Sequence, residues 1–293
     1  MTKVLVIGAS GRIGSKVVKE LDKNSEGIEV ILATNFPEEA KIWEKENRKY
    51  VVFDLNNPKD FPDALEGIDR LFLLTTYTSD MLFQAKTLVD AAKAAGVKHI
   101  VHLGVFTSRN DFIPHFTWHD LIESYIAASG IAWTNIHPNV VTESILITNP
   151  PIEESLSFIS LVEDAPQGWA MTDDIGAVAG TVLREGPEKH DQKDYYISTD
   201  VLTSKEVAQV LSNVSGKEIT PAYSSIEDMK RRNDQITSGP TRAYMESAEI
   251  TMKKTLDGEF PAQNTLKDDV LTVTGRPGKT MEDWAKEYFK DKN

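Results

Sequence analysis

Residues 3–14 read KVLVIGASGRIG, and this stretch decides the fold. Its first part, from Val4 to Ile7, is apolar throughout, as in a strand that is buried on both faces. Glycines follow at positions 8, 11 and 14, and apolar residues then recur at helical spacing up to Leu21. The stretch therefore predicts a strand, a glycine-rich turn and a helix.

The spacing of these glycines indicates a site for a dinucleotide. Gly8 permits the sharp turn, Gly11 lets a diphosphate approach the backbone, and Gly14 lets helix and strand pack closely. The helix N-terminus would face the anion. A purely structural turn is the alternative, but the strand-to-helix context at this point favours the cofactor. We expect contacts from the whole loop: Gly8, Ser10, Gly11, Arg12, Ile13 and Gly14.

The composition narrows the classes of partner. Among 293 residues, 45 acidic and 32 basic side chains give a formal net charge of -13, which repels nucleic acid and anionic lipid. The absence of cysteine excludes disulfides, thiolate metal sites and a cysteine nucleophile. There is no basic leader and no apolar run of membrane-spanning length. We expect a soluble cytoplasmic protein, monomeric or homodimeric, that binds neither nucleic acid nor membrane.

Strand and helix patterns alternate after the first unit. Strands are expected at 29–33, 50–54, 70–75, 98–103 and 131–136, and helices at 37–48, 60–66, 81–95 and 116–129. Alternation of this kind predicts a parallel sheet, here a Rossmann-type, doubly wound α/β fold. Four prolines, at 138, 150, 151 and 166, then mark an irregular or extended segment.

The rest of the chain predicts a second region. A helix at 173–183 and a strand at 194–198 should pack back on the sheet, and helices follow at 203–215, within 226–256 with a break at Gly239 and Pro240, and at 281–290. We therefore expect an NAD(P)-binding Rossmann domain at 1–140, joined by 170–200, and a smaller, mainly helical substrate-binding region at 141–169 and 201–293.

The end of the second strand bears on the choice of cofactor. NAD-specific folds place an acidic residue there to accept the ribose hydroxyls, whereas this chain has Thr34 and Asn35. Neutral side chains tolerate a 2′-phosphate, and Arg12 could bind it. Arg12 as a solvated surface residue is the alternative. The sequence favours NADP(H), with NAD(H) possible.

The ends of the other strands provide the remaining expected contacts, because ligands bind at the carboxyl edge of open parallel sheets. Asp54 and Leu55 would meet the adenine, although Asp54 could equally cap its own loop. The other expected cofactor contacts are Thr75, Thr76, Tyr77, Gly104, Val105, Pro138, Asn139 and Val140. An apolar wall for the substrate is expected from Phe106, Phe112, Phe116, Trp118 and Trp169, although aromatic residues are more often core.

The tyrosine and lysine pair of ordinary short-chain dehydrogenases, spaced four residues apart, has no convincing match. Tyr288 and Lys292 have this spacing but stand at the end of the chain, and Tyr125 is followed by Ser129 at the lysine place. Proton exchange with a carbonyl through a tyrosine is thereby disfavoured.

Five motifs resemble those of a known family. They are GASGRIG (8–14), AGVKHI (95–100), SGIAWT (129–134), TDDI (172–175) and VTGRPGKTMEDW (273–284). The chain resembles, over nearly its whole length, the NmrA-like branch of the atypical short-chain dehydrogenases, which includes triphenylmethane reductase, relatives of quinone oxidoreductase and phenylcoumaran benzylic ether reductases. The arginine that often grips the 2′-phosphate in these relatives is Thr34 here.

The resemblance also implies a catalytic position. In the ether reductases a catalytic lysine stands fifteen residues before the threonine that corresponds to Thr134, and this place holds His119, as in triphenylmethane reductase. An imidazole there would donate a proton or bond the cofactor ribose. The alternative is a helix-terminal histidine satisfied by the backbone. His115 and His102 are weaker candidates, and no metal is expected, since His115 with His119 makes an incomplete site.

These features together predict an NAD(P)H-dependent reductase. It would transfer hydride from the nicotinamide to an apolar, conjugated small molecule such as a quinone, a dye or an imine-like compound, because such acceptors need little proton chemistry. The alternative is an NmrA-like redox sensor that binds the dinucleotide and regulates a partner without catalysis.

Overall fold

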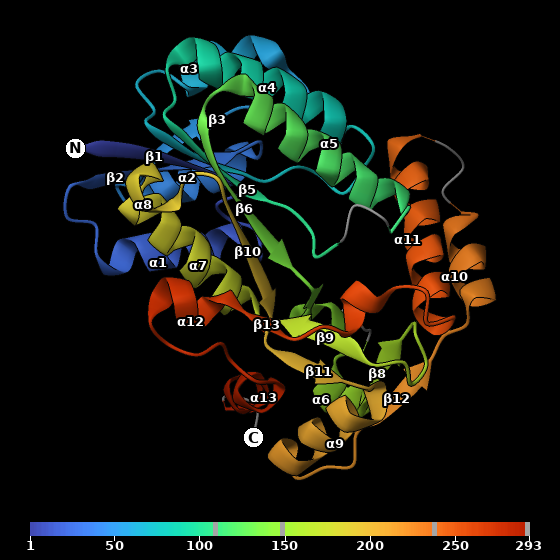
Figure 1. The fold of residues 1–293 in the computed structure, drawn as a ribbon. Helices are drawn as coiled ribbons and strands as arrows, with labels where there is room; N and C mark the ends of the chain where they lie inside the picture. Colours follow the sequence, from blue (N-terminus) through green and yellow to red (C-terminus); the bar gives the residue numbers. More distant parts are fainter. Residues whose placement is uncertain (108–110, 147–149, 236–238, 291–293) are drawn as a thin grey trace.

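The computed structural model describes residues 1–107, 111–146, 150–235 and 239–290, and a large sheet lies at its centre (Figure 1). The strand order is β13-β10-β6-β5-β4-β1-β2-β3, and every pairing is parallel except that of β13 with β10. The order from β3 to β6 is that of doubly wound dinucleotide-binding folds, so the predicted Rossmann-type fold is confirmed. The strands are β1 (Thr2–Ile7), β2 (Ile28–Thr34), β3 (Lys49–Val52), β4 (Arg70–Leu73), β5 (His99–Leu103), β6 (Ala132–Pro138), β10 (Lys193–Ser198) and β13 (Lys267–Asp268).

Helices cover both faces of this sheet (Figure 1). Successive side chains of a strand point to opposite faces, so Val4 and Val6 of β1 enter one core while Leu5 and Ile7 enter the other. The first core is shared with α1 (Gly14–Lys23), α2 (Pro37–Lys45), α7 (Thr172–Glu185) and α12 (Asp269–Thr274), and the short α8 (Pro187–His190) follows α7. The second core is shared with α3 (Phe61–Ala64), α4 (Met81–Ala95) and α5 (Pro114–Ser129).

A third core lies beyond the carboxyl ends of the strands and contains Ile145, Phe158, Trp169, Leu211 and Trp284. Helices α6 (Ile152–Ser155), α9 (Ser204–Ser215) and α13 (Met281–Phe289) contribute to this core, and α10 (Ile226–Asn233) and α11 (Pro240–Leu256) follow α9 along the chain. Two small sheets accompany them, β11-β9-β7 and β12-β8. Their strands are β7 (Val140–Val141), β8 (Ser157–Ser160), β9 (Gln167–Ala170), β11 (Asp200–Leu202) and β12 (Thr220–Tyr223).

These small sheets lie where the sequence predicts an irregular or extended segment after Pro138, and its extended parts are short, paired strands. Three strands and two short helical segments lie within its described part, including a 3-10 helix at Thr142–Leu146. Each strand has only two to four residues and pairs with distant chain, as β8 does with β12. Such pairing leaves no local pattern to recognise. The later β13 and α12 also join the large sheet and its helical layer.

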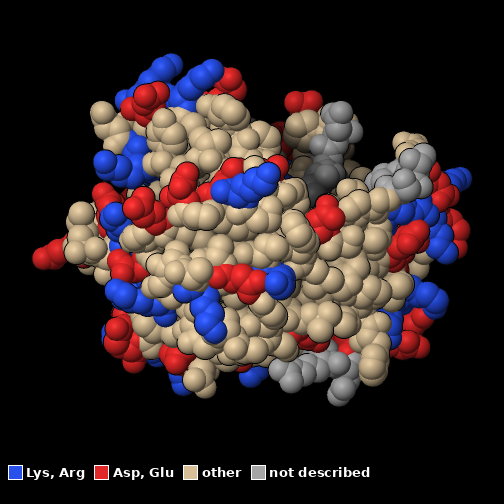
Figure 2. Space-filling view, turned by 90° about the horizontal axis from the view of Figure 1, so that it is seen from above, with Lys and Arg blue, Asp and Glu red and all other residues tan. Residues whose placement is uncertain are grey.

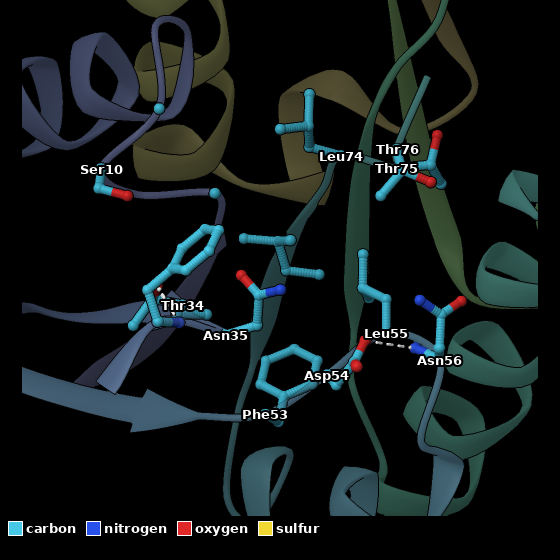
Figure 3. A pocket seen from close by; sticks show the side chains of 15 residues that line it. Ser10, Thr34, Asn35, Phe53, Asp54, Leu55, Asn56, Leu74, Thr75 and Thr76 are labelled. Atoms are coloured by element: carbon cyan, nitrogen blue, oxygen red, sulfur yellow. Dashed lines mark hydrogen bonds between the residues drawn. The ribbon is translucent and has the colours of Figure 1, made fainter. Parts of the chain in front are cut away.

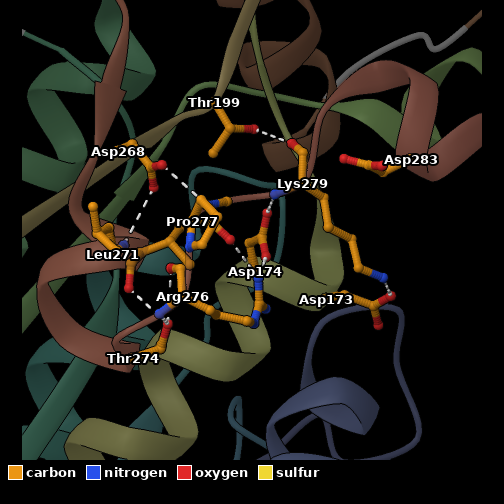
Figure 4. A network of polar contacts seen from close by, with 12 residues as sticks. Asp173, Asp174, Thr199, Asp268, Leu271, Thr274, Arg276, Pro277, Lys279 and Asp283 are labelled. Carbon is orange, nitrogen blue, oxygen red and sulfur yellow. Dashed lines mark hydrogen bonds and ion pairs between the residues drawn. The ribbon is translucent and has the colours of Figure 1, made fainter.

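The segment at 274–280 ties α7 to the C-terminal region (Figure 4). The buried carboxylate of Asp174 accepts the backbone N–H of Lys279 at 2.6 Å and forms an ion pair with Arg276 at 2.7 Å. Burial raises the pKa of Asp174, and the Lys279 N–H and Arg276 oppose this change. Asp173, beside it, pairs with Lys16 and Lys279 at 2.8 Å each. The motifs at 172–175 and 273–284 therefore have a structural role: they hold the C-terminal segment against the start of α7.

An Asp174→Ala variant should lose about 1–3 kcal/mol of unfolding free energy, because the partly buried N–H of Lys279 would lose its acceptor and Arg276 its ion pair. Asp173→Ala is the matched control: its ion pairs are partly exposed, so we expect a loss below about 1 kcal/mol. Urea unfolding of both variants measures the difference. Equal losses would contradict the assigned role of Asp174.

Figure 2 shows charged side chains of both signs interspersed over this face, with uncharged residues covering much of the surface between them. The acidic excess is thus not gathered into a single patch on this face. Within the described ranges, every helix is too short or too polar to cross a membrane.

Candidate functional site

A cavity of 240 Å³ opens at the carboxyl ends of β1, β2, β3 and β4 (Figure 3). Its lining consists of Ile7, Gly8, Ser10, Gly11, Ala33, Thr34, Asn35, Phe36, Phe53, Asp54, Leu55, Asn56, Leu74, Thr75 and Thr76. Most of the residues expected at the adenosine and diphosphate are among them. The apolar Phe36, Phe53 and Leu74 were not predicted, although each follows or precedes a predicted contact directly.

The glycine turn is built so that backbone faces this cavity. Gly8 has φ +66°, and the N–H of Gly11 donates to the carbonyl oxygen of Gly8 at 2.8 Å. A Cβ added at Gly14 would overlap with that oxygen, which explains the third glycine. Helix α1 begins at Gly14, so its N-terminus lies at the turn. The turn fits a diphosphate, because the small glycines let an anion approach the backbone at a helix N-terminus, which attracts negative charge.

A carboxylate that was not predicted stands at the end of β2. The hydroxyls of Ser10 and Thr34 both donate to Oε2 of Glu39, the first at 2.6 Å, and the N–H of Phe36 donates to Thr34 Oγ1 at 3.0 Å. The end of β2 itself holds the neutral Thr34 and Asn35, as the sequence indicates, but a carboxylate from α2 reaches Thr34. Glu39 belongs to the first turn of α2, and the fold of the chain between β2 and α2 brings its side chain next to Thr34. An acidic residue five positions after the strand was the available signal.

The loops after β3 and β4 are held together by the buried Gln84. Its Oε1 accepts the N–H and the hydroxyl of Thr76 at 3.2 and 3.0 Å, and its Nε2 donates to Asn56 at 3.0 Å. Asp54 lines the cavity and also accepts the N–H of Asn56 at 2.8 Å (Figure 3). Both interpretations of Asp54, ligand contact and loop cap, are thus compatible with its place.

A second cavity, of 110 Å³, adjoins the first and shares Leu74, Thr75 and Thr76 with it. The rest of its lining consists of Ile13, Tyr77, Met81, Leu103, Gly104, Val105, His115, His119, Pro138, Asn139, Val141 and Tyr244. Asn139 is anchored, since its backbone N–H donates to Ile197 and its side-chain amide to Ser198. The two cavities together follow the carboxyl edge of the sheet.

Helix α11 closes the second cavity on one side. The ring of Tyr244 lies 5.7 Å from that of Tyr77 and 5.0 Å from that of His115. Nδ1 of His115 and the hydroxyl of Ser247 are 2.7 Å apart, and burial lowers the pKa of His115 to about 4. No sequence motif marks Tyr244 as part of this cavity, because α11 reaches it from more than a hundred residues away.

His119 lies on the face of α5 that lines the second cavity. Its Nδ1 is shielded from solvent and has no hydrogen-bond partner among the described residues. Burial lowers the pKa of His119 well below its ordinary value, and the nearby His102, His115 and His137 lower it further. At neutral pH the imidazole is therefore uncharged, with one N–H to donate.

The remaining expected residues lie elsewhere. Arg12 and Gly14 line neither cavity; the charge of Arg12 partly offsets the burial that raises the pKa of Tyr77. Val140 and Trp169 line a third, mainly apolar cavity of 480 Å³ on the other side of β7.

The other aromatic residues expected at the substrate also lie outside the two joined cavities. Phe106 is buried with its ring 5.2 Å from Tyr196, and Phe112 is 78% exposed. Trp118 packs into the core beneath α4 and α5, and Phe116 packs on Phe260. The expected apolar wall is therefore not formed by this set.

Tyr125 and Tyr288, the two tyrosines compared with the catalytic tyrosine of short-chain dehydrogenases, form hydrogen bonds outside the two cavities. Tyr125 donates to Asp90 and Tyr288 to Glu153, while Lys292 lies outside the described residues. Glu123, His137 and Asp194 have ligand atoms within 4.8 Å of one another. Both ring nitrogens of His137 are engaged, with Val105 and Asp194, so this cluster is an ion pair network.

The sheet order and the two joined cavities at the glycine turn define the class of doubly wound dinucleotide-binding folds. The NmrA-like family model matches residues 1–265, and the chain belongs to this family.

Characterised relatives match over much of their length. The chain is 27% identical over 289 residues to an NAD(P)H azoreductase of Xenophilus azovorans, covering 97% of each protein. It is 26% identical to quinone oxidoreductase 2 of Escherichia coli, covering 74% of this chain and 76% of the relative. The solved Citrobacter triphenylmethane reductase complexed with NADP(H) has the same fold, with a TM-score of 0.78, 23% identity and coverage of 98% and 99%.

Proposed function

We propose that this protein is an NAD(P)H-dependent reductase. The observation that carries the proposal is the pair of joined cavities, with the glycine turn beside one and His119 lining the other. The first cavity would hold the adenosine and diphosphate, and Gly104, Pro138 and Asn139 would flank the nicotinamide in the second. A bound dinucleotide supplies hydride to an acceptor; the chain positions the two and excludes water.

We propose a flat, conjugated, mainly apolar acceptor, such as a quinone, an azo compound or a dye cation. Hydride addition to such a system leaves charge that delocalises, so a neutral histidine suffices where a carbonyl would need a tyrosine and a lysine. The relatives named for azo and quinone reduction support this acceptor class.

Turnover tests the proposal against a catalytically silent redox sensor. NADPH oxidation would be followed with a panel of quinones, azo dyes and cationic dyes, beside fluorescence titration with NADPH and NADH. We expect saturable oxidation with at least one acceptor. Tight dinucleotide binding without turnover on any of them would instead favour the sensor.

A Glu39→Gln variant should raise the affinity for NADPH about tenfold, because the carboxylate bound by Thr34 and Ser10 would repel a 2′-phosphate placed beside it. Affinity for NADH should stay the same or fall, since the carboxylate can accept ribose hydroxyls. We favour NADPH as the cofactor of the parent protein despite this repulsion. Fluorescence titration of both cofactors measures the shift, and an equal change for both would refute the placement of Glu39.

A further inference from the structure

A row of ionisable side chains runs behind the second cavity. His119 and Glu123 are four residues apart on α5 and therefore share the face that packs on the sheet. His102 of β5, His137 of β6 and Asp194 of β10 stand opposite on neighbouring strands. The row begins at the cavity with His119 and ends at Asp194, whose side chain is 42% exposed.

The gaps between successive members are short. The rings of His119 and His102 are 5.5 Å apart. Nδ1 of His102 lies 3.9 Å from Oε1 of Glu123, and Nδ1 of His137 lies 3.7 Å from the same oxygen. Nε2 of His137 donates to Asp194 at 2.9 Å. A Cβ on Gly104 would come within 2.6 Å of this Glu123 oxygen, so a glycine keeps the space between cavity and row.

The three histidines of the row differ in protonation state. His137 donates from both ring nitrogens, to Val105 and Asp194, and is therefore a cation. Burial alone would lower its pKa, but Asp194 and Glu123 hold the pKa of His137 above its ordinary value. His102 is completely buried, and burial lowers its pKa to about 3, opposed in part by Asn135. An imidazolium thus stands behind two neutral imidazoles.

Every element packed on His137 contributes to its surroundings. Helix α5 provides Glu123 and His119, β5 provides His102, and β10 provides Asp194 together with Tyr196, whose ring stacks on His137 at 4.6 Å. The two carboxylates face the imidazolium from opposite sides.

His102 differs from His99 and His190 in the hydrogen bonding of its ring nitrogens. Neither of its ring nitrogens makes a hydrogen bond of normal geometry with a described residue, although the side chain of Asn135 lies close enough to raise its pKa. By contrast, Nε2 of His99 on the same strand bonds Thr134 at 2.9 Å, although its Nδ1 also lacks a partner among the described residues, and His190 bonds Tyr195 and Glu185. A buried polar atom without a partner costs stability, and a place in a transfer chain accounts for it at His102.

We propose that Asp194, His137, Glu123 and His102 form a proton path that resupplies His119, and this rests on the proposed reductase function. His119 gives its N–H proton to the reduced acceptor and takes another at Nδ1 from His102. His102 is reprotonated by way of Glu123 with the Nδ1 proton of the His137 cation, which is left neutral with its other proton on Nε2. As Asp194 delivers a proton from solvent, this ring and those of His102 and His119 exchange tautomers, so that each again carries a proton on the nitrogen that lost it. One proton enters at the surface for each proton that leaves at the cavity.

The acceptor decides whether this path is used. Reduction of a quinone takes a hydride, which carries both electrons, and one proton to form the hydroquinone. A cationic triarylmethane dye takes the hydride at its central carbon and is then neutral, so it needs no proton. The same protein can therefore be assayed with and without the proton step.

The experiment compares His102→Leu and the isosteric Glu123→Gln with His99→Leu, a control on the same strand outside the row. Turnover is measured with a quinone and with a triarylmethane cation, across pH and in deuterated water, and NADPH affinity is measured by fluorescence without acceptor. We expect both row variants to lose at least tenfold in quinone turnover, with dye reduction and NADPH affinity changed less than about twofold. Any change in turnover of the His99→Leu control should be the same with the quinone and with the dye.

Equal losses on both acceptors would show a structural role and overturn the path, as would unchanged quinone turnover in both row variants. A parent protein that binds NADPH but reduces neither acceptor would refute the proposed function itself, which is a separate result. In the parent, the solvent isotope effect should be larger with the quinone than with the dye; equal effects would also contradict the path.

Discussion

A Gly11→Leu variant is expected to lose more than 100-fold in dinucleotide affinity while it keeps its fold. Gly11 lines the first cavity, and a Cβ there would lie 3.1 Å from the carbonyl oxygen of Gly8, a contact that small shifts can relieve. The rest of the leucine side chain would occupy space that the diphosphate needs. A 100-fold loss corresponds to about 2.7 kcal/mol of binding free energy. Fluorescence titration with NADPH and NADH measures it.

Gly14→Ala is the contrasting variant for the same turn. Its Cβ would overlap with the Gly8 carbonyl oxygen, so it should lower both stability and affinity. Urea unfolding separates the two variants, because only Gly14→Ala should lose substantial unfolding free energy. Undiminished cofactor affinity in a folded Gly11→Leu protein would show that the dinucleotide does not bind at this turn.

Replacement of His119 by alanine should have the second large effect. With a quinone we expect a fall in turnover of about 100-fold, the lower end of what loss of a proton donor costs. With a cationic dye the fall should stay below about tenfold, because His119 then only orients the cofactor or closes the cavity wall. Steady-state kinetics with the two acceptors, beside NADPH titration, measure both effects.

The pH dependence provides an independent check on His119. Its pKa lies well below the ordinary value, so the imidazole stays neutral and the parent rate should show no ionisation of this residue near pH 7. A parent rate that follows an ionisation near neutral pH, absent from the variant, would mean that His119 acts as a charged acid. No change in turnover or affinity would place His119 outside the site.

The large sheet and the glycine turn were predictable because their signals are local. Val4 to Ile7 and the three glycines specify one strand, one turn and one helix by their spacing alone. The ends of the parallel strands then had to share an edge, which predicted the neighbourhood of Thr34, Thr75 and Gly104.

Other parts of the site arise from tertiary contacts. Glu39 reaches Thr34 only because α2 folds back on the end of β2, and Tyr244 arrives on a distant helix. The aromatic residues near 106–118 are expected to line the substrate cavity only because they are aromatic and follow the fifth strand. Residue type alone does not distinguish a ring in the core from one in a cavity wall. Phe106 and Trp118 pack inward, and Phe112 points to solvent.

The antiparallel strand β13 has a consequence during biosynthesis. The sheet edge at β10 is complete at Ser198, but its partner begins only at Lys267. At about 5–20 residues per second the ribosome needs roughly 4–14 s to make the intervening chain. For that interval β10 presents unpaired N–H and C=O groups, the kind of edge on which nascent chains aggregate. Arg276 and Lys279, the partners of Asp174, are also made only after that interval. A nascent chain stalled before residue 267 would therefore have an unpaired strand edge at β10 and an Asp174 carboxylate without its two partners.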